Sequence, residues 1–188
     1  MAAIFNQFFG KYEGAPFNLV KKYDDRLEER EYPAYKWVCT KRGPDDKGTL
    51  GENGMFFRLF DYISGQNEDK KKIAMTVPVS TWVSVSIDGS EEFREMCFFI
   101  GEEFQEKPPK PTNELVFIKE RPTMTIFTRT IGGYVKDRKW AEEADHVKKM
   151  IKEKEGDIQI DETGYYQTGY DSPIKFINRR NEVWWVKK

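Results

Sequence analysis

The sequence predicts an α+β fold in which two helices pack against one curved, largely antiparallel sheet. The first observation is a duplication, because the order strand, helix, strand, strand occurs in residues roughly 28–105 and again in residues roughly 114–188. The second is a change of hydrophobic period within each half, from the period of strands to that of a helix and back. The third is size, because halves of about 80 residues have marginal cores. We therefore expect one domain over residues 1–188.

The first half begins with a predicted strand over residues 32–40, where large apolar side chains alternate with small or polar ones. A helix is expected to follow over residues 55–63 and to end near Gly65. Its apolar residues have the spacing i, i+3, i+4 and i+7, which forms one face of a helix. These residues are Phe56, Leu59, Phe60 and Ile63.

Two further strands complete the first half. Residues 73–87 are rich in valine and threonine, and Pro78 within them favours an edge position or a bulge because proline cannot donate to a strand ladder. Residues 95–104 form the next predicted strand. The prolines of residues 108–111 form a stiff connector to the second half.

The second half repeats this order of elements. Residues 115–119 and 123–130 are predicted strands, and a helix follows that ends near Gly156. Strands over residues 165–170 and 182–186 complete the chain. The apolar face of the second helix consists of Trp140, Ala144, Val147 and Ile151.

Charge and hydropathy exclude several classes of function. Lys+Arg 31 and Asp+Glu 32 are interspersed, so the chain offers no electrostatic basis for binding nucleic acid. No stretch approaches the ~20 apolar residues of a membrane span, so we expect none. The N-terminus has neither a basic start nor a continuous apolar run, so no signal peptide is expected and the predicted location is cytoplasmic.

The two cysteines, Cys39 and Cys97, both lie in apolar stretches. A single disulfide between them would suit a secreted protein of this size. Two buried thiols in a reducing compartment are the simpler interpretation, and the sequence predicts that state.

No catalytic group of residues is recognisable, so we expect that the protein is not an enzyme. The single histidine, His146, lies away from the apolar face of the second helix and is expected to face solvent. A metal site built from it and the two separated cysteines has no supporting spacing. Residues 48–54 are glycine-rich and precede a helix, but they lack the Gly-Lys-Ser/Thr ending of a phosphate loop.

Two local strings are more specific than these patterns. One is Ile-Ala-Met-Thr-Val-Pro-Val-Ser at residues 73–80, and the other is Tyr-Tyr-Gln-Thr-Gly-Tyr-Asp-Ser-Pro-Ile-Lys at residues 165–175. Both resemble the SOUL, or haem-binding protein, family, and residues 36–38 and 124–127 are most similar to its heme-binding protein 2 branch. The resemblance implies a distorted antiparallel β-barrel made of two βαββ repeats, with two helices packed on it.

The resemblance also implies that a tetrapyrrole binds in a shallow apolar cleft between the first helix and the loop before the last strand. Here those regions are residues 55–63 and 170–180. The apolar residues of the helix could instead pack in the core. The basic residues of the loop could instead be ordinary surface charges. The candidate haem-binding residues are Phe56, Leu59, Phe60, Ile63, Ile174, Phe176 and, for the propionates, Lys175 and Arg179.

The chain departs from the family pattern in two ways. Some members place basic residues on the first helix, where this chain has Asn53 and Asp61, and no histidine falls near the expected cleft. We therefore expect weak, reversible haem binding without a histidine axial ligand. The expected role is a non-enzymatic carrier or buffer in the cytoplasm, with mitochondrial association as a further expectation. The alternative is a ligand-free protein-interaction module in stress or cell-death signalling, with a protein partner in place of haem.

Overall fold

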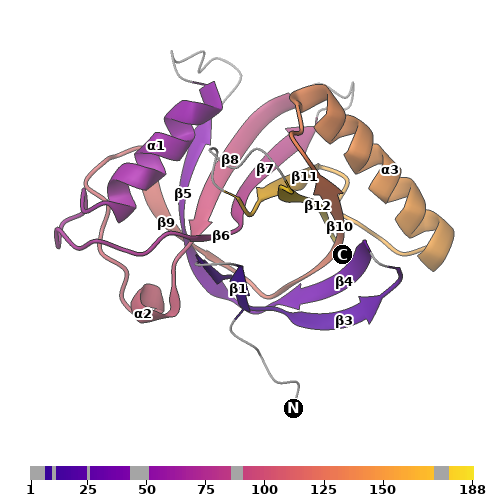
Figure 1. The fold of residues 1–188 in the computed structure, drawn as a ribbon, viewed down its shortest axis with the longest axis horizontal. Coiled ribbons are helices and arrows are strands. Elements are labelled where there is room, and N and C mark those ends of the chain that lie inside the picture. Colours follow the sequence, from indigo (N-terminus) through magenta and orange to yellow (C-terminus); the bar gives the residue numbers. More distant parts are fainter. Residues whose placement is uncertain (1–6, 10–11, 25, 43–50, 86–90, 172–177) are drawn as a thin grey trace.

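Nine strands form one curled antiparallel sheet in the computed structural model of the chain (Figure 1). The structure describes residues 7–9, 12–24, 26–42, 51–85, 91–171 and 178–188. In chain order, the strands of this sheet are β3 (Asn18–Lys22), β4 (Leu27–Tyr32), β5 (Tyr35–Arg42), β7 (Val79–Val85), β8 (Glu91–Phe99), β9 (Val116–Arg121), β10 (Met124–Gly132), β11 (Gly164–Gly169) and β12 (Arg180–Val186). Their order across the sheet is β3-β4-β10-β12-β11-β7-β8-β5-β9.

The predicted α+β class is confirmed, and the predicted antiparallel barrel is an open half-barrel. Within the described residues, the end strands β3 and β9 do not pair with each other, so the curled sheet stays open. A separate three-stranded sheet contains β1 (Gln7–Phe9), β2 (Tyr12–Gly14) and β6 (Thr76–Val77). The helices are α1 (Gly51–Ile63), α2 (Glu102–Gln105) and α3 (Asp137–Glu155), of which the short α2 was not predicted. In the described part of the chain, no helix has both the length and the apolar character that crossing a membrane requires.

The predicted duplication is confirmed, and it explains how one sheet contains both halves of the chain. One repeat contains β5, α1, β7 and β8, and the other contains β10, α3, β11 and β12. The two repeats meet where β7 pairs with β11, from Ser84 opposite Gly164 to Val79 opposite Gly169. The strand that precedes each repeat pairs with the other repeat, because β4 lies against β10 and β9 lies against β5. Neither half therefore completes its own part of the sheet.

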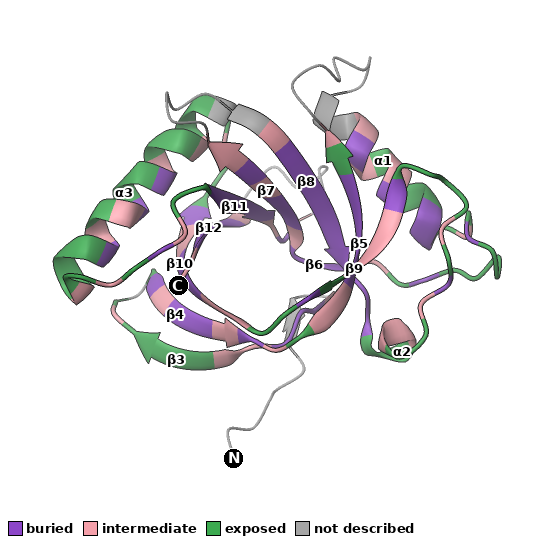
Figure 2. Ribbon diagram, turned by 180° about the vertical axis from the view of Figure 1, so that it is seen from behind, coloured by how far each residue is buried: buried purple, intermediate pink, exposed green. Residues whose placement is uncertain are grey.

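The two long helices pack on the same side of the sheet, near its opposite ends (Figures 1 and 2). Alternate residues of a strand face opposite sides, so Val38 and Phe98 meet α1, while Phe127 and Val183 meet α3. The apolar face predicted for α3 is confirmed, whereas on α1 only Leu59 and Ile63 of the four predicted residues are buried. The buried helix residues are Met55, Leu59, Tyr62 and Ile63 on α1, and Ala144, Val147 and Ile151 on α3.

Aromatic side chains fill the inner, concave side of the sheet. Tyr32, Trp37, Phe99, Tyr166 and Trp184 belong to one buried cluster there. Each is less than a tenth exposed, and the Tyr32 and Trp184 ring centroids are 4.9 Å apart. The concave side is therefore part of the packed core.

The long strand predicted over residues 73–87 is divided. Pairing begins at Thr76, and the cis peptide bond between Val77 and Pro78 separates β6 from β7. The two pieces join different sheets, since β6 pairs with β2 and β7 pairs with β8 and β11.

The strand predicted over residues 95–104 ends early, at Phe99, and α2 follows. The Gln105 side chain explains this ending. Its oxygen accepts a hydrogen bond from Lys36 N at 2.8 Å, and its amide donates to Lys36 O at 2.9 Å. The side chain thus pairs with the Lys36 N–H that a longer β8 would have used, while Lys36 O also accepts a hydrogen bond from Ile100 N at 3.3 Å.

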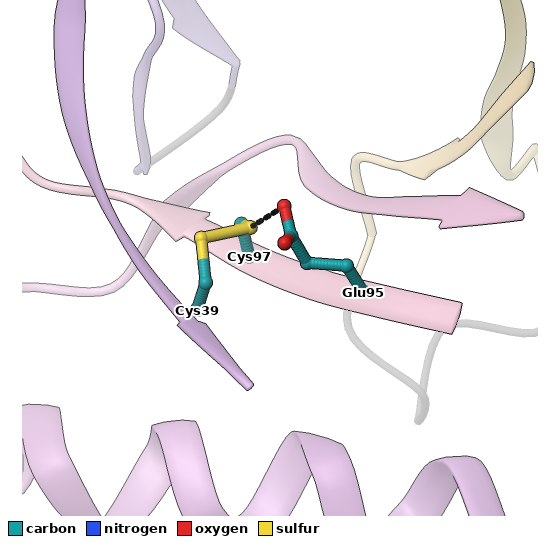
Figure 3. A group of neighbouring side chains, drawn as sticks. All are labelled: Cys39, Glu95 and Cys97. Atoms are coloured by element: carbon teal, nitrogen blue, oxygen red, sulfur yellow. Dashed lines mark hydrogen bonds between the residues drawn. A yellow bond between two sulfur atoms is a disulfide. The ribbon is translucent and has the colours of Figure 1, made fainter. Parts of the chain in front are cut away.

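The prediction of two unpaired thiols is wrong, because Cys39 and Cys97 form a disulfide (Figure 3). Cys39 on β5 lies directly opposite Cys97 on β8, with the Cα atoms 4.1 Å apart. The alternation of apolar residues indicated that both side chains are buried, but it contains no information on which residues of two distant strands are opposite each other.

Candidate ligand-binding cleft

An apolar cleft of about 160 Å³ lies between α1, the β6–β7 segment and the end of β11. Phe56 and Phe60 form its helix side. Met75, Val77 and Val79 form the strand side, and Tyr12 from β2 joins them because β2 pairs with β6. The remaining wall is Gly169, Tyr170 and Asp171.

The helix wall is a pair of stacked aromatic rings. Phe56 and Phe60 lie one helical turn apart, with ring centroids 6.0 Å apart and an angle of 16° between the rings. Phe56 also packs on Phe98 at 5.3 Å, which holds the pair against the sheet. Phe60 remains 42% exposed, so the outer ring of the pair faces solvent at the cleft. An exposed aromatic ring beside an apolar hollow is a suitable surface for a flat apolar ligand.

The structure divides the four predicted residues of α1 between two faces. Phe56 and Phe60 line the cleft, whereas Leu59 and Ile63 are buried beneath the helix at 0% and 6% exposure. Adjacent helix positions differ by about 100°, so residues 56 and 60 share one direction and residues 59 and 63 share another. The sequence spacing grouped these residues on one broad apolar face and did not distinguish cleft from core.

The predicted residues of the final loop have different outcomes. Ile174, Lys175 and Phe176 lie outside the described residues. Arg179 is described, and its guanidinium lies over the ring of Tyr134 at 4.7 Å. It lines a second hollow and is not part of the cleft wall.

Sequence reasoning missed several residues of the cleft. Met75, Val77 and Val79 lie within the string that carried the family resemblance, which was the available signal. Their orientation depends on the division of the strand at Pro78, which has no periodic signature. Tyr12 was not among the predicted site residues, because only the pairing of Glu13 with Thr76 brings β2 to this place.

Behind the cleft wall, Tyr170 contacts a buried carboxylate. Its hydroxyl donates to Glu182 Oε2 at 2.7 Å, and Trp184 Nε1 donates to the same oxygen at 2.8 Å. Arg30 donates to Glu182 at 3.0 Å and Arg180 donates at 2.6 Å. Burial alone would raise the pKa of Glu182, but the two guanidinium groups and the indole N–H outweigh burial and lower this pKa to about 2. Glu182 is therefore ionised throughout the neutral range.

The same contacts determine the state of Tyr170. Burial, reinforced by the negative charge of Glu182, raises the pKa of Tyr170 well above its usual value. The side chain therefore stays a neutral phenol and keeps its proton on the hydrogen bond to Glu182. It presents a ring to the cleft and is not an available phenolate.

The rim of the cleft is held by backbone contacts. Arg180 N donates to Asp171 Oδ2 at 2.5 Å, and Tyr170 N donates to Arg180 O at 3.2 Å. These contacts hold the end of β11 beside the start of β12. The position of Tyr170 and Asp171 in the cleft wall follows from that pairing.

His146, the one histidine of the sequence, is exposed on α3 and is not among the residues that line the cleft. The sulfur-containing side chain in the cleft wall is Met75. Because the pKa of Tyr170 is raised, the thioether of Met75 is a more available ligand atom in this wall than the Tyr170 oxygen.

A second group of polar atoms lies inside the sheet. Cys39, Glu95 and Cys97 approach within 4.8 Å of one another (Figure 3). The sulfurs are joined in a disulfide, so they are not thiolate ligands, and Lys119 Nζ already lies 2.7 Å from Glu95 Oε1. In this state, the group does not fit a metal ion.

Comparison with known proteins identifies similar sequences over nearly the whole chain. Residues 12–186 match the family described as SOUL heme-binding protein. Heme-binding protein 2 of Homo sapiens is 38% identical over 165 residues, which cover 86% of this chain and 78% of that protein. Heme-binding protein 1 of Mus musculus is 32% identical over 191 residues, which cover 100% and 99%. The crystal structure of the EcmrR C-terminal domain is similar in fold, with a TM-score of 0.58 at 11% identity over 87% of this chain and 97% of that chain.

Proposed function

Because the chain belongs to the SOUL heme-binding protein family, we propose that it binds haem or a related tetrapyrrole without catalysing a reaction. We propose the cleft between α1 and the end of β11 as the site. The observation that supports this choice most directly is the stacked pair of Phe56 and Phe60, whose outer ring is exposed beside an apolar hollow. A flat macrocycle can lie against such a pair.

The size of the cleft favours weak, reversible binding. Its volume of about 160 Å³ is below the roughly 300–1,000 Å³ of ordinary ligand pockets, so it would accept one edge of the macrocycle. Burial of about 300 Å² of apolar porphyrin contributes roughly 7 kcal/mol before the cost of association. That cost is at least about 4 kcal/mol, so apolar contact alone corresponds to roughly millimolar affinity. With the contacts to the propionates added, we propose affinity in the micromolar range or weaker.

Axial ligation by histidine is not part of this proposal. The one histidine of the chain is exposed on α3, outside the cleft wall. Tyr170 is held as a neutral phenol, so Met75 is a better candidate than Tyr170 for contact with the iron. For the propionates, Lys175 remains a candidate, whereas Arg179 is stacked on Tyr134 in another hollow.

A haemin titration with two matched variants tests this proposal. Phe60→Asp places a charge in the cleft wall, and we expect it to weaken haemin binding by about tenfold or more, because it removes ring contact and leaves a desolvated carboxylate. Phe57→Asp is the control, because Phe57 lies on the same helix, is 55% exposed and does not line the cleft. It should change affinity by less than about twofold.

The readout is the Soret absorbance of haemin under conditions that suppress aggregation. Absence of a Soret shift with tens of micromolar wild-type protein would reject haem binding. Equal weakening by the two variants would reject this cleft as the site.

We propose a carrier or buffer role, in the cytoplasm and with association to mitochondria. The disulfide between Cys39 and Cys97 is compatible with a reducing compartment only because both residues are 0% exposed, and thiol exchange requires access to a sulfur. The alternative of a ligand-free interaction module is not favoured, because the relatives are named as haem-binding proteins.

A further inference from the structure

A second hollow, of about 790 Å³, lies between α3, the β3–β4 turn and the neighbouring ends of β10 and β12. It shares no lining residue with the apolar cleft. Its character is also different, because basic side chains line it from four separate segments. They are Arg26, Arg129, Lys139, Arg179 and Arg180.

The folding of the sheet, and not sequence proximity, brings these cations together. The backbone carbonyl of Arg26 accepts a hydrogen bond from Thr130 N at 3.1 Å. This contact holds the β3–β4 turn beside β10. Arg180 lies opposite Gly132, which places the start of β12 at the same end of β10. Arg129 reaches across to α3, where it donates to Glu143 at 2.6 Å.

The hollow has an excess of positive charge. Its lining contains five basic side chains and two carboxylates, Glu28 and Glu143, which leaves three positive charges in the lining itself. One of the lining cations, Arg180, also pairs with the buried Glu182 at 2.6 Å. Both carboxylates already contact arginines, since Glu28 lies 2.6 Å from Arg30 and Glu143 lies 2.6 Å from Arg129. The acidic side chains therefore offer little further neutralisation of the other cations.

Several donors of the hollow have no partner among the residues that the structure describes. In the part of the chain that the structure describes, Arg26 and Lys139 are exposed and neither forms an ion pair. The Nε atom of Arg129 is buried and has no hydrogen-bond partner among the described residues. Because that N–H is enclosed by protein, Arg26 and Lys139 are the cations that an acceptor from outside the chain can contact.

We propose that this hollow binds an anion with two or more phosphate groups. Guanidinium groups donate paired hydrogen bonds that match phosphate oxygens, and a lysine adds a point charge. A ligand with several phosphates balances the excess charge of the hollow, which a single neutral or apolar ligand does not. The shared chemistry is a cluster of phosphates, on a small soluble molecule or on a lipid headgroup.

Titration calorimetry with sodium pyrophosphate and with inositol hexakisphosphate tests the soluble source. Co-sedimentation with phosphatidylcholine vesicles, with and without phosphatidylinositol bisphosphate, tests the headgroup. Lys139→Glu and Arg26→Glu should each weaken binding by about tenfold, because each replaces a donor by a repelling carboxylate. Both residues are exposed, so the fold should tolerate the change.

Arg138→Glu is the matched control. Arg138 precedes Lys139 on α3, its side chain is 92% exposed, and it is not part of the lining. The variant changes net charge as much as Lys139→Glu does, yet it should alter affinity by less than about twofold. Haemin binding should be the same in Lys139→Glu and in the wild type, which separates this site from the cleft.

Two results would overturn the proposal. One is the absence of binding by wild-type protein to both soluble probes and to the phosphoinositide vesicles. The other is equal weakening by Arg138→Glu and Lys139→Glu, which would show attraction to net charge rather than to a site. Binding of the soluble probes or of the vesicles, lost in Lys139→Glu and kept in Arg138→Glu, supports the site and identifies the source of the phosphate.

Discussion

At the residue scale, Glu182 connects the two hollows of the molecule. Its carboxylate accepts hydrogen bonds from Tyr170, which lines the apolar cleft, and from Arg180, which lines the basic hollow. Arg30 and Trp184 also donate to it, and the side chains of Arg30 and Glu182 are 2% and 0% exposed. A buried charge in such a network is strongly coupled to its partners, so removal of one member leaves the others unpaired.

Glu182→Gln should therefore lower the free energy of unfolding at pH 7 by about 3–5 kcal/mol, because it removes the buried carboxylate that pairs with both Arg30 and Arg180. The effect should shrink in acid. The pKa of Glu182 is lowered from 4.5 to about 2, so its ionised form stabilises the fold above about pH 4.5. That stabilisation is lost as the pH falls through about 2. Urea unfolding at a series of pH values measures both effects.

Glu142→Gln is the control for this prediction, because Glu142 is 60% exposed and pairs with Arg138 on the surface. It should change the free energy of unfolding by less than about 0.5 kcal/mol at any of these pH values. A difference between wild type and Glu182→Gln that stays constant from pH 7 to pH 2 would contradict the assignment of a depressed pKa.

At the scale of elements, the pairing of β7 with β11 joins the two repeats. Gly164 begins β11 opposite Ser84, and it leaves no room for a side chain there. A Cβ atom at this position would lie 2.4 Å from Val83 O and 2.6 Å from Trp82 Cζ2. The close approach of the two backbones therefore depends on glycine at this one position.

Gly164→Ala should destabilise the protein by about 1–3 kcal/mol, because the backbone oxygen of the paired strand cannot move aside cheaply. Gly132→Ala is the matched control on β10, where the nearest atom to an added Cβ is Arg179 O at 4.0 Å. Its effect should be below about 0.5 kcal/mol. Thermal unfolding followed by circular dichroism compares the two, and equal midpoints would refute the steric argument.

At the scale of the whole molecule, the sheet depends on both halves of the chain. β4 precedes the first repeat but pairs with β10 of the second, and β9 precedes the second repeat but pairs with β5 of the first. Each half alone would expose edges and apolar faces that its partner covers. We therefore propose that the chain folds as one unit.

Two fragments test that proposal. Residues 1–111 and residues 112–188, produced separately, should show no cooperative thermal transition, whereas their co-expression should restore one. Far-ultraviolet circular dichroism and size-exclusion chromatography provide the measurements. A cooperative transition in either isolated fragment would show that the halves are independent domains.

Much of the fold could be predicted from the sequence because it depends on local periodicity. The spacing of Ala144, Val147 and Ile151 identified the buried face of α3, and the repeated order of elements predicted the duplication that the sheet displays. The strings at residues 73–80 and 165–175 identified the family. Periodicity indicates which side of an element is apolar, and that property belongs to the sequence alone.

Only the tertiary structure decided what each apolar or charged side faces. It separated Phe60 in the cleft from Leu59 in the core, it placed Cys39 opposite Cys97, and it brought Arg179 to the basic hollow. The physical reason is that strand register and the meeting of distant segments depend on pairings between residues far apart in the chain. A local pattern contains no information about those pairings.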